Sequence, residues 1–449
     1  MKRIISIAFI LIAPYLPSTA AAEDTLRISS FDVDATPSPG TWLVYDKMVN
    51  SWDQSLRAKG IVLTGSGKPI VLCVIDWIGI ANEGYDEFCK ALAEAAGTTP
   101  DRVALHALHQ HDAPVCDFGA EQWLKKEGMD ALGFEGTFSR EVIRRLRESV
   151  AASLKQLKPV THIGLGQAEV YKVASNRRIV GPQGKVIASR TSATKDPAVR
   201  NQPEGLIDPM VQLVSFWNND KPLAVLSYYA THPQSYYRTG VANPDIPGVA
   251  RFFRQLAVPD ALHLHFNGAG GNITAGKYND GSRENRLVLA ERLADGMQRA
   301  WKQTVKEKVN ISNIRWTTAP VALPPKKSLD TLGRLLHRET STFIANNVSK
   351  LVWLERVKKG RTISISSLRI GTARMVHLPG ECFIEYQLAA KAMQPDMFVT
   401  VAAYGDYAPG YIGTVAAYEE GGYETGQASA VTPEAEKVLL EAIRKVLAE

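Results

Sequence analysis

Cysteine is scarce in this sequence: the chain of 449 residues contains four, and no two of them form a CxxC pair. Four cysteines are too few for a scaffold that depends on disulfides. Cys73 and Cys89 lie in apolar contexts that are typical of buried small side chains. Cys116 and Cys382 each lie close to a candidate site segment, and both a disulfide between them and two free thiols stay open.

Long apolar runs are also absent, apart from one short stretch near the start of the chain. Two basic residues precede an apolar stretch over 4–13, and three alanines at 20–22 follow it. This pattern is typical of a secretory signal peptide, and the stretch is too short to cross a bilayer comfortably. We therefore expect a signal peptide over 1–22, no transmembrane segment, and a mature chain over 23–449 that is periplasmic or secreted.

A strong charge imbalance is missing as well. The chain has 52 basic and 46 acidic residues. Removal of the leader takes away Lys2 and Arg3 and no acid, which leaves an excess of about four positive charges. No Lys/Arg stripe is interleaved with aromatic residues, so we expect no nucleic-acid partner.

Repeats and Ser/Pro-rich linkers are absent too, which predicts one large domain over 23–449 made of interlocked layers.

Apolar runs alternate with stretches of helical periodicity along the mature chain. This alternation is typical of an α/β protein with mixed β-sheets covered by helices. The predicted strands cover 61–64, 70–75, 102–108, 161–165, 211–216, 223–229, 261–266, 367–378 and 398–403. The predicted helices lie near 85–96, 139–156, 282–303, 328–350, 383–393 and 433–448. Residues 174–207 follow neither period, so we expect a functional surface loop or lid there.

The segment His109-Gln110-His111 stands where an apolar run ends and a proline-containing loop begins. On an extended backbone, side chains two residues apart point the same way, so both imidazoles can enter one cavity. Metal sites and acid/base sites are both built in this way. The residues alone leave the two alternatives open.

Other chemically active residues also follow strand-like runs. His232 comes after a buried run, Glu381 follows a Leu-Pro-Gly turn, and Tyr411 lies in a Gly-Tyr-Ile-Gly segment. A glycine-rich stretch over 267–276 allows the main chain to pass close to a ligand or metal. Taken singly, each of these features is also common in purely structural roles.

Taken in order, these segments resemble the catalytic region of the neutral, non-lysosomal ceramidase family. The family's motifs are similar to His109-Gln110-His111-Asp112-Ala113-Pro114, Asn176-Arg177, Ala230-Thr231-His232-Pro233, Asp245-Ile246-Pro247-Gly248, Gly271-Asn272-Ile273-Thr274-Ala275-Gly276, Pro379-Gly380-Glu381 and Tyr411-Ile412-Gly413-Thr414. The matches keep the family's order over nearly the whole mature chain. The resemblance implies the family's α/β fold and hydrolysis of an N-acyl amide bond.

The resemblance also implies one zinc ion per chain, held by His109, His232, Glu381 and Tyr411. Two imidazoles and a carboxylate are a normal catalytic zinc set, whereas a phenol is unusual. Such a zinc ion lowers the pKa of a bound water towards roughly 7 and makes hydroxide available to attack an amide carbonyl.

Further roles follow from the same resemblance. His111 is expected to handle a proton or to contact the substrate, while Arg177 and Tyr411 are expected to stabilise an oxyanion. The expected substrate-binding residues are Asn176, Gly271, Asn272 and Thr274. Three other histidines match no motif, and we expect structural roles for them: His106, His263 and His265.

The sequence also departs from the family. The family's Gly-Asp-x-Ser-Pro-Asn loop has lost its carboxylate, serine and proline over 271–276, and the sequence ends one helix after the Tyr411 segment, where the family continues into an immunoglobulin-like domain.

Three interpretations of the function stay open. The first is a secreted zinc amidohydrolase acting on ceramide or another N-acylated lipid-like or small molecule. The second is the same site acting on an ester or modified carbohydrate, and the third is a non-catalytic binding protein. Oligomeric state and peripheral membrane contact are left open.

Overall fold

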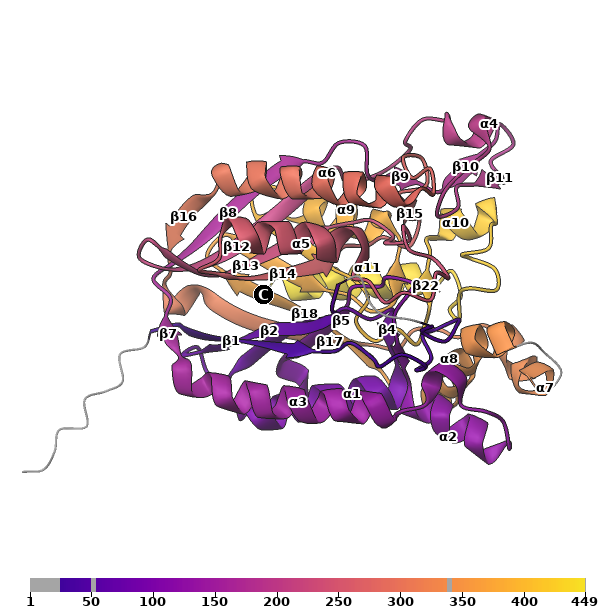
Figure 1. The fold of residues 1–449 in the computed structure, drawn as a ribbon, viewed down its shortest axis with the longest axis horizontal. Helices are drawn as coiled ribbons and strands as arrows, with labels where there is room; N and C mark the ends of the chain where they lie inside the picture. Colours follow the sequence, from indigo (N-terminus) through magenta and orange to yellow (C-terminus); the bar gives the residue numbers. More distant parts are fainter. Residues whose placement is uncertain (1–24, 50–53, 337–340, 449) are drawn as a thin grey trace, which may run out of the picture.

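A computed structural model describes residues 25–49, 54–336 and 341–448. The expected signal peptide, 1–22, lies outside the described residues. Three mixed β-sheets form the centre of the molecule, and helices cover their outer faces (Figure 1). The expected α/β class with mixed sheets is therefore confirmed. Within the described ranges, no helix combines the length and the apolar composition needed to cross a bilayer.

The first sheet has the strand order β5-β3-β2-β1-β7. Its strands are β1 (Arg27–Asp34), β2 (Arg57–Thr64), β3 (Ile70–Ile75), β5 (Val103–Ala107) and β7 (Lys158–Pro159). Strand β3 is antiparallel to β2 and parallel to β5. Every side chain of β3 is buried, because alternate residues enter two different cores. One core lies under α1 (Asn82–Ala96) and α3 (Thr137–Ser153), and the other faces the second sheet.

The second sheet has the order β14-β13-β12-β8-β16. Its strands are β8 (His162–Glu169), β12 (Met210–Asn218), β13 (Lys221–Tyr229), β14 (Leu262–Asn267) and β16 (Val305–Lys308). One face packs against the first sheet, and the other packs under α5 (Asp245–Ala257) and α6 (Arg283–Lys302), on the opposite side of the molecule from α1 and α3 (Figure 1). A helix–sheet–sheet–helix stack results.

The third sheet, β17-β18-β19-β21, borders both of the others. Its strands are β17 (Ile314–Val321), β18 (Ile363–Ile370), β19 (Ala373–His377) and β21 (Phe398–Ala402). Helices α9 (Ile384–Met393) and α11 (Ala435–Ala448) pack on it. Four two-stranded pairs complete the described sheets: β4 (Gly79–Ile80) with β6 (Val115–Cys116), β9 (Ser175–Asn176) with β15 (Ile273–Thr274), β10 (Arg178–Val180) with β11 (Val186–Ser189), and β20 (Glu381–Cys382) with β22 (Tyr411–Ile412).

Three predicted elements differ from the structure. The strand predicted over 367–378 is a hairpin of β18 and β19, because Gly371 takes a left-handed φ of +55° and turns the chain. Over the range predicted as one helix near 328–350, the described residues begin with a 3₁₀ turn (Lys327–Thr331) and continue as α7 (Leu332–Leu336) and, from residue 341, α8 (Ser341–Lys358). The loop predicted over 174–207 contains β9, β10, β11 and the short α4 (Pro197–Arg200).

Other elements were not predicted. They include β1, β17, α2 (Phe118–Lys126), α5 and α10 (Val415–Glu420). Helix α5 begins with Asp-Ile-Pro-Gly, a pattern that normally ends a helix. Pro247 is tolerated because it lies in the first turn, where its missing N–H would have no intrahelical partner. All four cysteines, Cys116 and Cys382 included, are buried free thiols.

Candidate metal centre and substrate cavity

Four segments converge where parallel strands of the three sheets end. His109 follows β5, His232 follows β13, Glu381 follows β19 and Tyr411 follows β21. Main-chain hydrogen bonds tie these strand ends together: the Ala107 N–H donates to the Tyr404 carbonyl, and the Ala403 N–H donates to the Asn267 carbonyl. Because carboxyl ends from separate sheets meet in one place, residues far apart in the sequence become neighbours.

Main-chain carbonyls orient His109 and His232. His109 has a left-handed φ of 72°, and its Nδ1 donates to the Ile78 carbonyl at 2.7 Å. His232 Nδ1 donates to the Gly270 carbonyl at 3.3 Å. A neutral imidazole carries one proton, so a ring that donates through Nδ1 offers Nε2 as an acceptor, the form in which histidine binds a metal. Backbone contacts of this kind are typical of metal-binding histidines.

The two acceptor nitrogens point at each other and at a carboxylate. The Nε2 atoms of His109 and His232 are 3.2 Å apart. Glu381 Oε2 lies 3.2 Å from His109 Nε2 and 3.9 Å from His232 Nε2, and this buried oxygen has no hydrogen-bond partner among the described residues. Ligands of a tetrahedral zinc ion lie about 3.3 Å apart, as its bond lengths require. The three atoms fit a metal ion, which would remove the repulsion between their lone pairs.

The carboxylate of Glu381 is itself held in place. Its Oε1 accepts a hydrogen bond from the Tyr407 hydroxyl at 2.9 Å. Burial acts to raise the pKa of Glu381, but the hydrogen bond from Tyr407 and the positive charge of Arg177 act against burial, and the pKa lies below its ordinary value. Glu381 is therefore ionised and available as a ligand.

His111 lies beside this pair in a different environment. Its Nε2 accepts a hydrogen bond from Gln234 at 2.8 Å, and its buried Nδ1 has no hydrogen-bond partner. One ring nitrogen from each of His109, His111 and His232 falls within 4.8 Å of the others, so His111 also qualifies as a metal ligand by distance. Burial lowers the pKa of His111 well below its ordinary value, so the ring is neutral.

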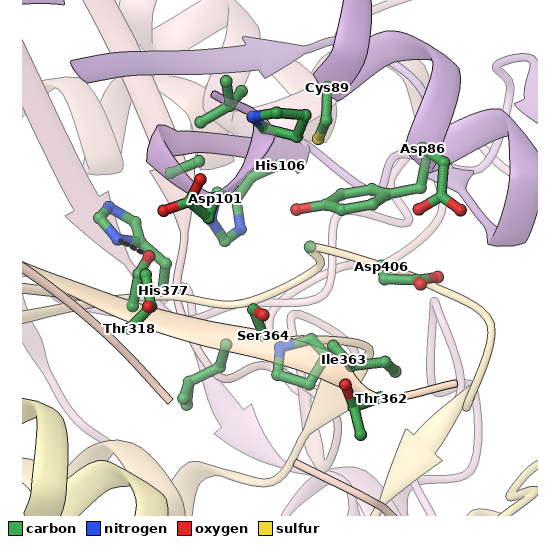
Figure 2. A pocket seen from close by; sticks show the side chains of 18 of the residues that line it. Asp86, Cys89, Asp101, His106, Thr318, Thr362, Ile363, Ser364, His377 and Asp406 are labelled. Carbon is green, nitrogen blue, oxygen red and sulfur yellow. Dashed lines mark hydrogen bonds between the residues drawn. The ribbon is translucent and has the colours of Figure 1, made fainter. Parts of the chain in front are cut away.

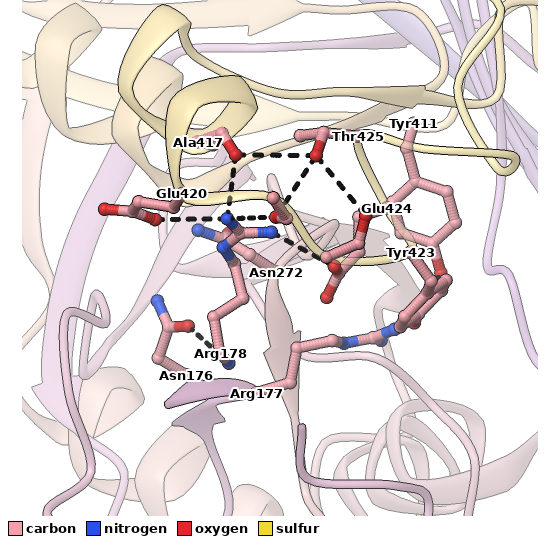
Figure 3. A network of polar contacts seen from close by, with 12 residues as sticks. Asn176, Arg177, Arg178, Asn272, Tyr411, Ala417, Glu420, Tyr423, Glu424 and Thr425 are labelled. Atoms are coloured by element: carbon pink, nitrogen blue, oxygen red, sulfur yellow. Dashed lines mark hydrogen bonds and ion pairs between the residues drawn. The ribbon is translucent and has the colours of Figure 1, made fainter. Parts of the chain in front are cut away.

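Tyr411 faces an arginine. Its hydroxyl accepts a hydrogen bond from Arg177 Nη1 at 3.2 Å and lies 3.4 Å from the Tyr423 hydroxyl. Its ring is parallel to that of His232, with centroids 6.3 Å apart. The guanidinium of Arg177 is buried and also donates to the Ile273 carbonyl. Figure 3 shows Arg177 reaching towards both tyrosines.

The neighbouring Arg178 holds the segment that carries Tyr423. It pairs with Glu420 and Glu424, both at 3.1 Å, and donates to the carbonyls of Ala417 and Gly421 (Figure 3). This network joins the segment predicted as a loop over 174–207 to the chain after Tyr411. The Arg177–Tyr423 contact is therefore fixed from both sides.

The four residues expected to bind substrate contact segments next to this centre. Asn272 bonds to the first turn of α9, and Asn176 and Thr274 donate to main-chain carbonyls of neighbouring loops. Gly271 lies against β20, where a Cβ atom would come within 2.3 Å of a carbonyl oxygen. None of the four lines the cavity described below. Their role in substrate binding stays a prediction, and their contacts indicate support of the metal-binding segments.

A cavity of about 570 Å³ opens onto the centre. This volume lies within the range of small-molecule sites. His109, His111, Glu381 and Tyr411 form its floor. The remaining walls combine apolar and aromatic side chains with polar and basic ones. They include Val44, Tyr45, Ile78, Val115, Phe134, Arg177, Arg190, Lys350 and Tyr423.

A second cavity, of about 410 Å³, is lined by residues of α1, β5, β18 and β19 (Figure 2). His106 and His377 line it, with ring centroids 5.4 Å apart. His106 Nδ1 donates to the Ala403 carbonyl at 2.7 Å, and His377 contacts Ser366. His106 thus supports the strand end that leads to the tyrosines, in keeping with its expected structural role.

Sequence reasoning missed several residues of the centre. They are Gln234, Tyr404, Tyr407 and Tyr423, together with Lys350 in the cavity wall. A signal for the tyrosines exists, because Tyr404 and Tyr407 fall between the predicted strand 398–403 and Tyr411. Gln234 lies two residues after His232. Nothing in the local sequence marks Lys350.

Solved structures provide a comparison for this arrangement. No protein-family model matches the chain, and no curated protein matches it. A neutral ceramidase from Pseudomonas aeruginosa superposes with a TM-score of 0.66 and 15% sequence identity, covering 94% of this chain and 74% of that one. A ceramidase complexed with C2 gives a TM-score of 0.67 and 16% identity, with the same coverage. The expected fold is confirmed: this chain has the fold of neutral ceramidase.

Proposed function

We propose that this protein is a zinc-dependent hydrolase that cleaves an N-acyl amide bond. The observation that carries this proposal is the convergence of two bare imidazole nitrogens and an orphaned, buried carboxylate oxygen on one point at the floor of a cavity. Nitrogen and carboxylate ligands in this number are the usual donors of catalytic zinc sites. We propose His109, His232 and Glu381 as ligands, with Tyr411 as the fourth.

A zinc ion bound there supplies an activated water and polarises the carbonyl of the substrate. The side chains of the chain provide the remaining functions. Arg177 and Tyr423 present donors from one wall of the cavity, and they stabilise negative charge that develops on the carbonyl oxygen. Arg177 is buried and held by hydrogen bonds to Tyr411 and to the Ile273 carbonyl, so this donor needs little reorganisation during the reaction.

His111 is the group proposed to transfer a proton. Amide cleavage requires a proton on the leaving nitrogen, and a neutral imidazole at the cavity floor can relay one. Its Nε2 accepts from Gln234, which leaves the ring proton on Nδ1, an atom without a hydrogen-bond partner among the described residues. When Nε2 takes up the proton released by the attacking water, the Nδ1 proton passes to the leaving nitrogen and the ring ends neutral. Gln234 thereby fixes both the orientation and the tautomer of His111.

The substrate proposed is an N-acylated, lipid-like molecule. The apolar side chains Val44, Ile78, Val115 and Phe134 give one part of the cavity the character that an acyl chain requires. The solved structures that share this fold include proteins named as ceramidases, so ceramide belongs among the compounds to be tested. Export through the signal peptide at 1–22 is part of the proposal, and mass spectrometry of the N-terminus of the purified protein tests it.

The test is a hydrolysis screen with measured metal content. Ceramides, N-acyl amino acids, N-acyl sugars and simple esters are offered to the wild type and to Glu381→Ala. We expect one zinc ion per chain, cleavage of at least one amide, and loss of both in the variant. Glu385→Gln is the matched control, because this carboxylate is four residues away and does not line the cavity.

Three results would contradict the proposal. Cleavage of esters but of no amide would favour the same site with a different substrate class. Activity that survives in Glu381→Ala would show that the site is elsewhere. A wild type that binds no zinc and cleaves none of the compounds would favour a non-catalytic binding protein.

A further inference from the structure

The cavity above the candidate metal centre is basic. Three cationic side chains line it, Arg177, Arg190 and Lys350, and Glu381 is the single carboxylate among its described lining residues. The second cavity differs, since four carboxylates and two cations line it. A bound metal ion would add further positive charge. The first cavity therefore has a charge complementary to an anion.

The two arginines already have partners in the protein. Arg177 donates to Tyr411 and to the Ile273 carbonyl. Arg190 donates to main-chain carbonyls of its own loop, including that of Asn176 at 2.6 Å. Both guanidinium groups are thus held by neutral acceptors, and the Nε atom of each has no hydrogen-bond partner among the described residues.

Lys350 is the third buried cation in the wall of this cavity. It lies on α8 and is 8% exposed. Its ammonium donates to the Gln427 carbonyl at 2.8 Å and contacts Asn347 Oδ1 at 3.4 Å. Among the described residues, no carboxylate lies within ion-pair distance of it. A buried ammonium without a counterion is costly, and such cations are normally paired.

Lys350 nevertheless keeps its charge at neutral pH. Burial lowers its pKa to about 8, while Glu381 acts in the opposite direction. The cavity wall therefore presents a cation whose counterion the described protein does not supply. An acidic group on a bound molecule would complete this pair, and a charge-assisted hydrogen bond would hold it.

We propose that Lys350 binds an anionic group of the substrate, so that the preferred substrate is an N-acylated compound with an acidic group besides the amide that is cleaved. This inference rests on the proposed amide hydrolysis and names its substrate class. N-acyl amino acids have this chemistry. A neutral ceramide does not.

A purely structural role for Lys350 is the alternative. Lys326 donates to the carbonyls of Thr425 and Gly426 at 2.6 Å, so both lysines hold the same stretch of chain, 425–427. Lys326 does not line the cavity. It is therefore a matched control that removes a carbonyl contact to this stretch without removing charge from the cavity.

The experiment compares N-lauroylglycine with its neutral counterpart N-lauroylglycinamide. The zinc-loaded wild type should have at least a tenfold higher kcat/KM for the acid, because a hydrogen bond to a charged group contributes roughly 1.5–3 kcal/mol. Lys350→Met should remove this preference, mainly through KM, and Lys350→Arg should restore most of it. Lys326→Met should change kcat/KM for both substrates by the same factor.

Other outcomes overturn the inference. If Lys350→Met lowers kcat/KM equally for both substrates, as Lys326→Met does, Lys350 only holds the chain. If the wild type cleaves the neutral amide at least as well as the acid, the substrate class is wrong while the proposed hydrolysis stands. If the wild type cleaves neither compound nor any other amide, the proposed function fails and this inference fails with it.

Discussion

His109 and His111 are two residues apart, yet they have different hydrogen-bond partners. His109 donates through Nδ1 to a main-chain carbonyl, and its Nε2 meets His232 and Glu381. His111 accepts through Nε2 from the side chain of Gln234. A main-chain carbonyl fixes the tautomer of His109, whereas the Gln234 amide can turn its oxygen towards Nε2 when the His111 ring takes up a proton. The two histidines should therefore respond differently to substitution.

His109→Ala should lose metal and activity together. His111→Ala should keep most of the metal and lower kcat by about 10²- to 10⁴-fold, which is the usual contribution of a general acid or base. Metal analysis beside steady-state kinetics measures both quantities, with His263→Gln as a histidine control outside the cavity. Equal loss of metal in both alanine variants would make His111 a ligand.

Arg177 and Tyr423 are proposed to act on the substrate and not on the metal. Neither is a proposed zinc ligand, and both line the cavity. Tyr423→Phe removes one hydroxyl donor and should lower kcat by about 10²-fold or more, with metal content unchanged, because fixed donors contribute mainly in the transition state. A change confined to KM would instead mean that Tyr423 contacts only the bound substrate.

A buried ion pair joins two elements next to the candidate metal centre. Asp76, directly after β3, accepts two hydrogen bonds from Arg251 on α5, at 2.8 and 2.6 Å. Gln110, between the two histidines, donates to the Asp76 carbonyl. The first sheet and α5 are thus connected next to His109. Removing one member of a buried pair leaves the other charge unpaired.

Arg251→Met should lower the free energy of unfolding by about 3–5 kcal/mol, the usual effect of breaking a buried ion pair. Arg254→Met is the control on the same helix, since Arg254 is also largely buried and makes no ion pair with a described carboxylate. Chemical denaturation of both variants measures the difference. Equal losses would show that packing of the arginine stems, and not the ion pair, stabilises this contact.

Histidines buried in neutral form make the stability of the whole molecule depend on pH. Burial lowers the pKa of His106 and of His263 from 6.5 to about 4, and that of His265 to about 3. Between these values and 6.5, the unfolded chain binds protons that the folded chain does not. The free energy of unfolding therefore falls as the pH falls through this range.

His263→Gln should flatten this dependence. A single histidine with this shift contributes about 2 kcal/mol of lost stability between about pH 7 and about pH 5. Asp117 and Asp406, with pKa values raised to about 7 and about 6, act in the opposite sense. Chemical denaturation of the variant and the wild type at both pH values isolates the contribution of His263. An equal loss of the free energy of unfolding in the two proteins would contradict the assigned pKa shift.

Part of the fold and of the site could be predicted from local pattern. Strands such as β3 and β13 are continuous apolar runs because both of their faces are buried, so they are visible in the sequence. Strand β1 alternates polar and apolar residues and was missed. Helix α5 was missed because its opening Asp-Ile-Pro-Gly resembles a turn. The free state of Cys116 and Cys382 also depends on spatial placement.

The sequence by itself determined the ends of the central strands and the chemical side chains that follow them, because burial and hydrogen-bonding capacity belong to each residue. Only the tertiary structure decided which strand ends face one another. It brings His109, His232 and Glu381 to within a few ångströms, and it adds Lys350 from a segment without a local signal. The reason is physical: packing of three sheets on shared cores sets distances between residues that no local interaction connects.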